Sequence, residues 1–366
     1  MNKDPFKEYI KESEPEKRVK GYAWHTAIGL QAVDGLKTSQ YLVDTAIRNI
    51  EGDISIDEAS ELLNSYYEEN PKTENDDRTE EADKVALRIA KILSEKAFSF
   101  TPNEYISIHK KLFVGIYKHA GKIRDYNITK KEWVLNGATV MYGSASELRT
   151  TLDYDFSEEK KFSYKNLSMD GIIHHLAVFV SRLWQIHIFA EGNTRTTAVF
   201  FIKYLRTLGF DATNDIFAEN AWYFRNSLVR ANYNNLRNGV HETTEYLELF
   251  LRNLLLEEKN ELHNRSMHIS GSLKADIENT KADIENTKAD IEKILTNIDD
   301  VIENKTVMHV TALYEECGRN NVFGRSGVER ITGLKSTRAS EIIKLMLEND
   351  VIEPVRGQGK GKYRFK

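Results

Sequence analysis

The sequence HIFAEGNTRTTAVF, positions 187–200, decides how the middle of this chain folds. Before it, Leu176, Val180 and Leu183 recur at the spacing of one helix face. After it, the largely apolar run TTAVFFIKYLRTLGF continues to Gly209, a residue that commonly ends helices. We therefore predict two buried helices joined by the tight turn AEGNTR, which begins the second helix.

This turn has the composition of an anion site. The first N–H groups of a helix have no internal partners and carry partial positive charge, so such an end binds phosphate. Gly192 lets an anion approach the backbone closely. Asn193 and Thr194 can cap the helix or donate hydrogen bonds, and Arg195 adds a bidentate cation.

Two residues beside the turn add chemistry. Glu191 offers a hard oxygen ligand that can hold Mg²⁺ against phosphate oxygens. His187, at the end of the preceding helix, can take a proton from a hydroxyl. Each residue alone has a structural explanation, but a base, a metal ligand and an anion site in this order indicate phosphoryl or nucleotidyl transfer. A zinc site formed by His174, His175 and His187 is not predicted, because their spacing is not ligand-like.

HIFAEGNTR resembles the signature His-x-Phe-x-(Asp/Glu)-Gly-Asn-x-Arg-x-x-Arg of the Fic (fido-domain) family. The segment LFVGIYKHAGKIRDYNITKKEWVLNGATVMYG resembles the family's approach segment and flap, and FRNSLVRANY resembles its downstream helix. The resemblance covers about residues 103–251. It implies a mainly α fold: a Fic-type helical core with a small β-hairpin flap that holds the target protein by strand addition.

The resemblance also implies an activity, transfer of AMP from ATP with Mg²⁺ to a Tyr, Thr or Ser hydroxyl of a target protein or of the chain itself. His187 would be the general base and Glu191 the Mg²⁺ ligand. The remaining roles implied are ATP binding by Gly192, Asn193, Thr194, Arg195 and Asn232, and target binding on the flap by Ile128, Thr129 and Lys130.

The chain departs from the signature at its last arginine, where Ala198 stands. In the family this arginine reaches the γ-phosphate and pairs with a glutamate from an inhibitory helix. Two explanations stay open: another cation serves the γ-phosphate, for which Arg230 is the candidate, or the arginine and its inhibitory partner have both been lost. The acid at 191 followed by Gly192 favours nucleotidyl transfer over phosphorylation.

Two N-terminal segments could supply an inhibitory acid. Asp34 and Gly35 occupy the Glu-Gly positions of a segment that resembles the family's inhibitory region. Ser65 and Glu69 match the short inhibitory pattern literally, although that pattern arises easily by chance in a glutamate-rich chain. We prefer Asp34 because of its sequence context.

The sequence divides into four regions. Residues 1–100 predict an N-terminal helical region of antitoxin-like, inhibitory type, and 103–256 the Fic (fido) catalytic domain. Residues 257–304 contain a heptad repeat, ADIENTKADIENTKADIEK, with Ile277, Ile284 and Ile291 seven residues apart. One apolar residue per heptad gives a thin seam, so we favour a solvated helical linker over a stable coiled coil.

Residues 305–366 hold twelve basic and seven acidic residues, whereas the whole chain has a net charge of -5. They predict three helices and a hairpin, which is the layout of a winged helix-turn-helix. The recognition helix of this motif would start at Ser336 or Thr337. Either DNA or a protein could be its partner. The candidate DNA contacts are Thr337, Arg338 and Ser340 on that helix, and Lys360 and Lys362 on the wing.

The rest of the composition is ordinary, with 40% hydrophobic and 29% charged residues. The single cysteine, Cys317, allows no disulfide within the chain, and no segment approaches the ~20 apolar residues of a membrane span. We expect a cytoplasmic protein that does not bind membranes; whether it forms a homodimer stays open. Besides an adenylyltransferase, two functions remain: a nucleotide-sensing DNA-binding regulator with an inactive fido domain, and a Fic-type phosphotransferase.

Overall fold

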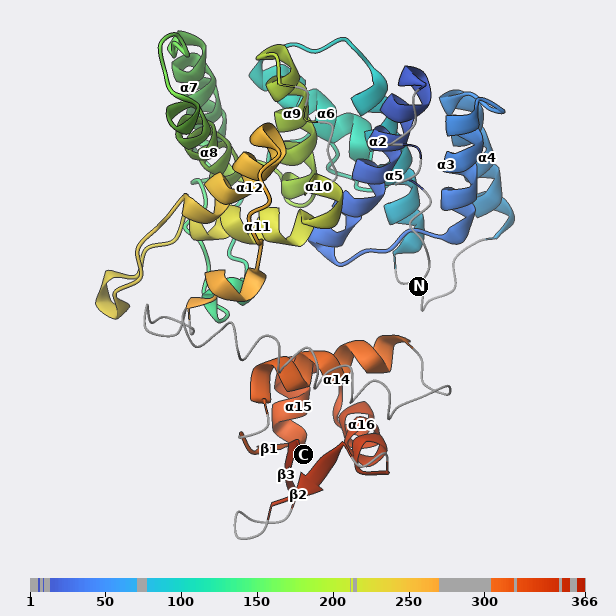
Figure 1. The fold of residues 1–366 in the computed structure, drawn as a ribbon, viewed down its shortest axis with the longest axis vertical. Coiled ribbons are helices and arrows are strands. Elements are labelled where there is room, and N and C mark those ends of the chain that lie inside the picture. Colours follow the sequence, from blue (N-terminus) through green and yellow to red (C-terminus); the bar gives the residue numbers. More distant parts are fainter. Residues whose placement is uncertain are drawn as a thin grey trace. The chain divides into compact units, whose positions relative to one another are not determined.

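The computed structural model of the chain describes residues 14–70, 78–210, 216–269, 304–318, 321–348, 351–355 and 361–365, together with Phe6, Tyr9 and Ala212. These residues fall into two compact units, Met1–Ser272 and Leu273–Lys366, each described by itself below (Figure 1). The heptad repeat and Lys360 lie outside the described residues.

The first unit is built of helices, as its proline-poor sequence predicts. Its N-terminal half contains α2 (Pro15–Gly29), η1 (Leu30–Asp34), α3 (Gln40–Glu51), α4 (Ile56–Glu69), α5 (Thr79–Ser94) and α6 (Pro102–Phe113). The rest contains η2 (Trp133–Leu135), α7 (Leu148–Lys161), α8 (Met169–Ile186), α9 (Asn193–Thr207), α10 (Ile216–Glu219), α11 (Ala221–Arg230), η3 (Leu236–Asn238), α12 (Glu245–Leu256) and η4 (Asn264–Met267). The expectation of a mainly α fold is confirmed.

Several of these helices begin and end where their sequences predict. Ser55 and Glu58 form a capping box at the start of α4, each side chain bonding the other's backbone N–H. At the end of α9, Gly209 takes a left-handed conformation with φ +90°, which a glycine adopts without steric cost. Both termini therefore follow from local chemistry rather than from tertiary contacts.

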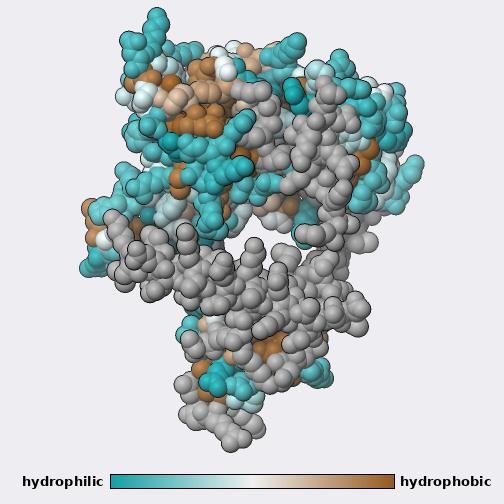
Figure 2. All heavy atoms as spheres, in the orientation of Figure 1, coloured by the Kyte–Doolittle hydropathy of each residue, from teal (hydrophilic) through white to brown (hydrophobic). Residues whose placement is uncertain are grey.

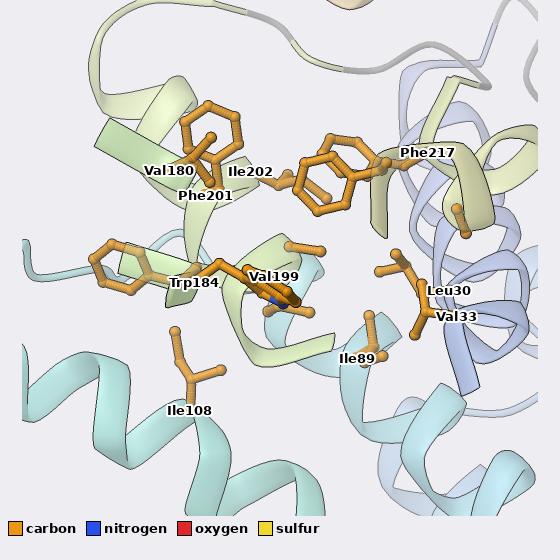
Figure 3. Packing of buried hydrophobic residues seen from close by; sticks show 14 of the residues in the cluster. Leu30, Val33, Ile89, Ile108, Val180, Trp184, Val199, Phe201, Ile202 and Phe217 are labelled. Carbon is orange, nitrogen blue, oxygen red and sulfur yellow. The ribbon is translucent and has the colours of Figure 1, made fainter. Parts of the chain in front are cut away.

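Helix α9 lies at the centre of the hydrophobic core. All of its residues from Asn193 to Leu205 are buried. Figure 3 shows Val199, Phe201 and Ile202 of α9 among apolar side chains from the surrounding elements. Because each large apolar side chain contributes about 1.5–3 kcal/mol when fully buried, α9 and the turn at its start are firmly placed.

The two regions 1–100 and 103–256 share this core. Leu30 and Val33 of η1 and Ile89 of α5 join the same cluster as the α9 residues (Figure 3). Helix α2 packs along α5, and η1 contacts both α9 and α11. The N-terminal region therefore lies directly against the part of the chain that carries the signature.

The predicted β-hairpin flap is wrong in its secondary structure. Residues 115–147 contain no strand, and the 3-10 helix η2 lies in their middle. Asn136 and Gly137 both have positive φ, and the Lys130 N–H bonds the Thr139 side chain instead of a strand partner. The backbone of Glu132 still pairs with Ala138, so the segment doubles back without forming a ladder. We call residues 124–143 the flap segment.

The second unit combines three helices with a small antiparallel sheet. It contains α14 (Asn304–Cys317), β1 (Phe323–Gly324), α15 (Arg325–Thr332), α16 (Ser336–Glu348), β2 (Ile352–Pro354) and β3 (Lys362–Phe365), with strand order β1-β3-β2. Gly333 ends α15 in a left-handed conformation, and α16 starts at Ser336, as predicted. Strand β1 was not predicted. The designation of this unit as a winged helix stays a prediction.

The surface of the described helices is mostly polar. Hydrophilic side chains cover most of the described surface that is visible in Figure 2, with small apolar areas between them. Among the described helices, none has both the length and the apolar character that crossing a bilayer requires.

Candidate active site

The turn between α8 and α9 is held by its own side chains and by two unusual backbone conformations. His187 caps α8 with φ 51°, and Gly192 precedes α9 with φ 75°. Asn193 spans the turn, since its Oδ1 accepts from the Phe189 N–H at 3.0 Å and its Nδ2 donates to the Phe189 carbonyl at 2.7 Å. Asn193 was predicted to bind ATP, and its side chain instead bonds within the turn.

Glycine is required at position 192 for two reasons. Its φ lies in the left-handed region, where a side chain is strained. A Cβ built there would also lie 2.4 Å from the ring of Phe113, which covers the turn. The backbone can therefore approach this aromatic ring, and leave the start of α9 open, only with glycine at this position.

His109 supports the same turn, and the sequence analysis missed it. Its Nδ1 accepts the Gly121 N–H at 2.8 Å, so its Nε2 carries the proton and donates to the Glu191 carbonyl at 3.0 Å. The ring stacks on Phe189 with centroids 3.6 Å apart. Burial lowers the pKa of His109 to about 4, which keeps it neutral in this role.

His187 is buried, and neither of its ring nitrogens has a hydrogen-bond partner among the described residues. Its ring packs against Tyr142 at 4.4 Å and Trp184 at 5.3 Å between centroids. Burial lowers the pKa of His187 well below 6.5, and the charge of Lys130 acts in the same direction. The imidazole is therefore neutral at pH 7 and able to accept a proton.

Arg124 fixes the backbone of His187. Its Nε donates to the His187 carbonyl at 2.8 Å, while its two terminal nitrogens donate to the Tyr126 and Gly143 carbonyls, both at 2.5 Å. One buried guanidinium thus joins the end of α8 to both ends of the flap segment. Nothing in the local sequence distinguishes Arg124 from a surface arginine, so it was not predicted.

The flap segment brings Lys130 to the turn. Its Nζ lies 3.3 Å from Glu191 Oε2, and both side chains are partly exposed. The other two predicted flap residues, Ile128 and Thr129, precede it, with Ile128 partly buried and Thr129 exposed. Of the three, Lys130 is placed to act directly on the site.

A buried acid ties the flap segment to α11 and to the packing around His187. Glu132 Oε2 lies 2.6 Å from Arg225 Nη1, and its Oε1 accepts the Tyr142 hydroxyl at 2.9 Å. Arg225 in turn lies over the ring of Trp222. Because Tyr142 packs on His187, this group fixes the wall against which the histidine lies.

The start of α9 presents free backbone donors. The Thr196 N–H makes the first bond of the helix, to the Gly192 carbonyl at 3.0 Å, so the N–H groups of residues 193–195 have no partner within the helix. The Thr194 hydroxyl is already engaged, since it accepts from Trp184 Nε1 at 3.0 Å. Because the hydroxyl accepts in that bond, it keeps its own proton to donate, so an anion at this end would be bound by the backbone N–H groups together with the Thr194 side chain.

Arg195 is fully buried within a charged cluster. Its Nε lies 2.8 Å from Asp34 Oδ2, and its Nη2 lies 2.8 Å from Glu81 Oε1 and 3.1 Å from the Tyr117 hydroxyl. Its Nη1 donates to Gln31 Oε1 at 3.0 Å. Burial would raise the pKa of Glu81, but the hydrogen bonds from Tyr117 and Arg195 outweigh it and lower that pKa. Arg195 was predicted as an ATP ligand; here its two terminal nitrogens bond protein groups and its Nε forms an ion pair with Asp34, and its binding of ATP stays a prediction.

The two candidate inhibitory segments lie in different surroundings. Asp34 ends η1, with Gly35 capping it in a left-handed conformation, and its carboxylate reaches Arg195. Ser65 and Glu69 lie exposed on α4. Only the first segment therefore touches the signature among the described residues, and it contacts the arginine that is present rather than position 198, where Ala198 is fully buried.

The two downstream candidates lie at the end of α11. Asn232 Nδ2 donates to the carbonyls of Ser181 and Leu228, at 3.0 and 2.9 Å. Arg230 is buried and donates to the His241 carbonyl at 3.2 Å, with burial lowering its pKa. Neither shares a hydrogen bond or an ion pair with the turn.

Glu191 fits a magnesium ion that is shared with a nucleotide. Among the described residues no group of three or more acids, histidines or cysteines could hold a metal by itself. Mg²⁺ is commonly held by one or two carboxylates together with substrate phosphates, and the half-exposed Glu191 carboxylate next to the anion site suits that arrangement.

In the second unit, the predicted nucleic-acid contacts on α16 are exposed, but some of them are engaged. Arg338 pairs with Glu341 at 2.8 Å, and the Ser340 hydroxyl donates to the Ser336 carbonyl. Thr337 and Lys362 are exposed as well. No contact among the described residues tests whether these side chains bind DNA.

Comparison with known proteins identifies one domain. Residues 99–205 match the Fic/DOC family model, so the chain carries a Fic/DOC family domain there. None of the curated proteins matches the chain. One structural neighbour is a Fic family protein from Desulfovibrio desulfuricans G20, with 11% sequence identity and a TM-score of 0.40, covering 96% of this chain and 88% of that chain. The matched residues include the whole turn from His187 to Arg195.

Proposed function

We propose that this chain is a protein adenylyltransferase that transfers AMP from ATP to a Tyr, Thr or Ser hydroxyl, on a target protein or on itself. One observation carries the proposal: a neutral histidine, whose ring nitrogens have no hydrogen-bond partner among the described residues, lies five residues before the glycine turn that begins a buried helix. A base and an anion site fixed at that spacing suit attack of a hydroxyl on a bound phosphate. The family of the domain at 99–205 is in keeping with such a transfer.

In the reaction, the hydroxyl oxygen forms a bond to the α-phosphorus while the bond to the leaving pyrophosphate breaks. His187 takes the hydroxyl proton. The backbone N–H groups at the start of α9 stabilise the charge on the phosphate oxygens, at no cost of reorganisation because α9 is buried. Glu191 would hold Mg²⁺, which neutralises phosphate charge when bound.

The site is closed in this structure, which bears on how a target enters. Both ring nitrogens of His187 are buried under neighbouring side chains. A target hydroxyl reaches them only when the flap segment shifts, and the partly exposed Lys130–Glu191 pair is the contact that most readily gives way. Binding of Mg²⁺ by Glu191 would compete with Lys130 for the same carboxylate.

Asp34 supports a regulatory part of the proposal. Its carboxylate occupies one side of the Arg195 guanidinium, where a phosphate would otherwise compete for the cation. We propose that Asp34 restrains nucleotide binding, in the role that the resemblance gives to an inhibitory acid. Its partial exposure lets it leave without unfolding the core.

Two other functions are distinguished by the same site. A phosphotransferase would place the γ-phosphate rather than the α-phosphate beside His187. A nucleotide-sensing regulator would bind ATP without using His187, and its output would pass through the second unit, for which we propose a winged helix that contacts DNA or protein. The buried, unpartnered His187 favours catalysis, since binding alone does not need a base there.

The test uses full-length protein, Mg²⁺ and ATP labelled at the α- or the γ-phosphate, with a total protein extract as a source of targets. Label transferred to protein from the α position alone, and lost in His187→Ala, supports AMP transfer. Transfer from the γ position alone would make the chain a phosphotransferase. If neither label is transferred by the wild type or by Asp34→Ala although ATP binds, the sensor is the better description.

A further inference from the structure

A bound triphosphate needs more positive charge than the turn itself offers. The signature's last arginine is replaced by Ala198, which is fully buried in α9. Arg195, the arginine that remains, has no exposed surface and is paired with Asp34 and Glu81. The turn therefore supplies backbone donors, its own arginine has no exposed surface, and Lys130 of the flap segment beside it is paired with Glu191.

Arg78 is a second arginine in the same cluster. Its Nη2 lies 2.8 Å from Glu81 Oε1, the same oxygen that Arg195 Nη2 contacts at 2.8 Å. The Tyr117 hydroxyl lies within 3.2 Å of both guanidinium groups. The two arginines thus share two partners and lie side by side. They differ in exposure, because the side chain of Arg78 is 50% exposed and that of Arg195 is 0% exposed.

Aromatic contacts tie this pair to the turn. Phe113 lies against Gly192 on one side and 4.8 Å from the Arg195 guanidinium, measured to its ring centroid. Tyr117, which binds both arginines, stacks on Phe113 at 4.9 Å. The Arg78–Arg195 pair therefore adjoins the aromatic rings that cover the Gly192 turn.

The backbone conformation of Arg78 is strained. Arg78 precedes α5 with φ 64°, a left-handed conformation that destabilises a non-glycine residue by roughly 1–2 kcal/mol. This conformation directs Nε and Nη2 onto Glu81. Strained positions of this kind concentrate at ligand sites.

We infer that Arg78 is the phosphate-binding cation that takes the place of the arginine missing at position 198, and that it contacts the terminal phosphate of ATP. The inference rests on the proposed nucleotide site. It differs from the candidate Arg230, which bonds the loop after α11 through Nη2 and whose buried Nε and Nη1 have no hydrogen-bond partner among the described residues. Glu81 holds Arg78 in place. Asp34, on the other side of Arg195, balances the charge of Arg195 when no nucleotide is bound.

The test measures nucleotide affinity by titration calorimetry in the full-length chain carrying His187→Ala, so that ATP is not consumed. ATP and AMP are each titrated with Mg²⁺ into the parent, Arg78→Ala and Arg78→Lys, and each series is repeated with Asp34→Ala. Lys84→Ala is the matched control, because Lys84 is another cation of α5 paired with an acid of its first turn, Glu80. Thermal unfolding checks that every variant folds.

We expect Arg78→Ala to weaken ATP binding about tenfold, as for the loss of one charge-assisted contact, with AMP affinity unchanged. Arg78→Lys should recover part of the loss and Lys84→Ala should change neither affinity. If Arg78→Ala and Lys84→Ala bind ATP equally well, or if ATP and AMP weaken together, the inference is overturned while the nucleotide site stands. If the parent binds no nucleotide with or without Asp34, the proposed function fails and the inference with it.

Discussion

His187 and Arg195 lie at the two ends of one short turn, and both are buried, but they differ completely in their partners. Both terminal nitrogens of Arg195 donate hydrogen bonds, to Gln31 and Glu81, and its Nε lies 2.8 Å from Asp34 Oδ2 as an ion pair without hydrogen-bond geometry. His187 has none on either ring nitrogen among the described residues. A buried polar group without a partner costs about 1–3 kcal/mol, so one end of the turn is complete and the other lacks something.

This difference in partners suggests a structural role for Arg195 and a catalytic role for His187. The Arg195 cluster stabilises the fold as it stands, because it pairs a buried cation with acids. The His187 backbone is held by Arg124, whereas its ring is held by packing alone among the described residues, which suits a group whose partner is a substrate hydroxyl. The signature contains both residues, but their environments assign them different work.

The largest expected effect is on the rate when His187 is removed. His187→Ala should lower the transfer of label from α-labelled ATP by about 10²- to 10⁴-fold, the usual contribution of a positioned base. His174→Ala is the control, since His174 lies on the same helix α8 and its exposed ring pairs with Glu248. An unchanged rate in His187→Ala would show that His187 is not the general base.

Arg195 should instead matter to stability. Arg195→Met should lower the free energy of unfolding of the first unit by about 3–5 kcal/mol, because Asp34 is left without its cation and Glu81 near the core keeps only the half-exposed Arg78. All four tryptophans of the chain precede residue 273, so tryptophan fluorescence in urea reports on this unit alone.

A second substitution sharpens that measurement. Adding Glu81→Gln to Arg195→Met removes the buried acid that has lost its buried cation, so the double variant should be more stable than Arg195→Met alone. Equal stability of the wild type and Arg195→Met would show that the cluster does not support the fold.

The support of the turn should also depend on pH. The pKa of His109 falls to about 4 in the folded chain, against 6.5 when unfolded, so the unfolded state takes up its proton first as the pH drops. This contribution to stability is complete above pH 6.5 and is lost between 6.5 and 4, amounting to about 3 kcal/mol. Unfolding in urea at several pH values should show a weaker pH dependence in His109→Gln; an identical dependence would contradict the role given to His109.

Much of this arrangement follows from the sequence. The helices around the turn and the glycine end of α9 are local features, and local patterns predicted them. The same patterns predicted the turn itself, because glycine, asparagine and a helix start follow one another within a few residues. The order of helices and hairpin in the second unit was predicted for the same reason.

What the sequence missed depends on contacts between distant residues. Glu81 and Arg124 contact the signature across 60 or more positions, Arg78 joins it through Glu81, and no spacing in the sequence marks them. The flap segment was predicted as a β-hairpin by resemblance, whereas its Asn136-Gly137 turn and η2 interrupt any ladder. Arg230 was chosen for its closeness to Asn232 in sequence, which says nothing of where a buried side chain points.

Gly192 provides a smaller effect that tests how closely the turn is packed. Gly192→Ala adds the strain of a left-handed conformation, about 1–2 kcal/mol, and moves the Phe113 ring, which a new Cβ would meet at 2.4 Å. Gly137→Ala is the matched control, because Gly137 has a similar φ of 84° and nothing within 4 Å. The difference in unfolding free energy between the two measures the contact with Phe113, and no difference would mean that the ring yields freely.

The smallest effect on stability is expected at Asp34. This substitution tests most directly whether the Arg195 cluster has a regulatory role as well as a structural one. Asp34→Ala removes one of two acids from Arg195, but Glu81 remains and the Asp34 side chain is 28% exposed. We therefore expect a loss of less than about 1 kcal/mol, as for other partly exposed pairs. Its activity should nevertheless rise, because the side of Arg195 that Asp34 covers becomes available to phosphate.

Glu69→Ala distinguishes regulation from a general effect of removing negative charge, since Glu69 is exposed on α4 and belongs to the competing inhibitory pattern. Transfer of α-label should increase in Asp34→Ala and stay at the wild-type level in Glu69→Ala. The reverse result would place the restraint on α4. If activity rises in neither variant, Asp34 is only a structural partner of Arg195. The Arg195 cluster would then serve only to hold the turn that carries His187.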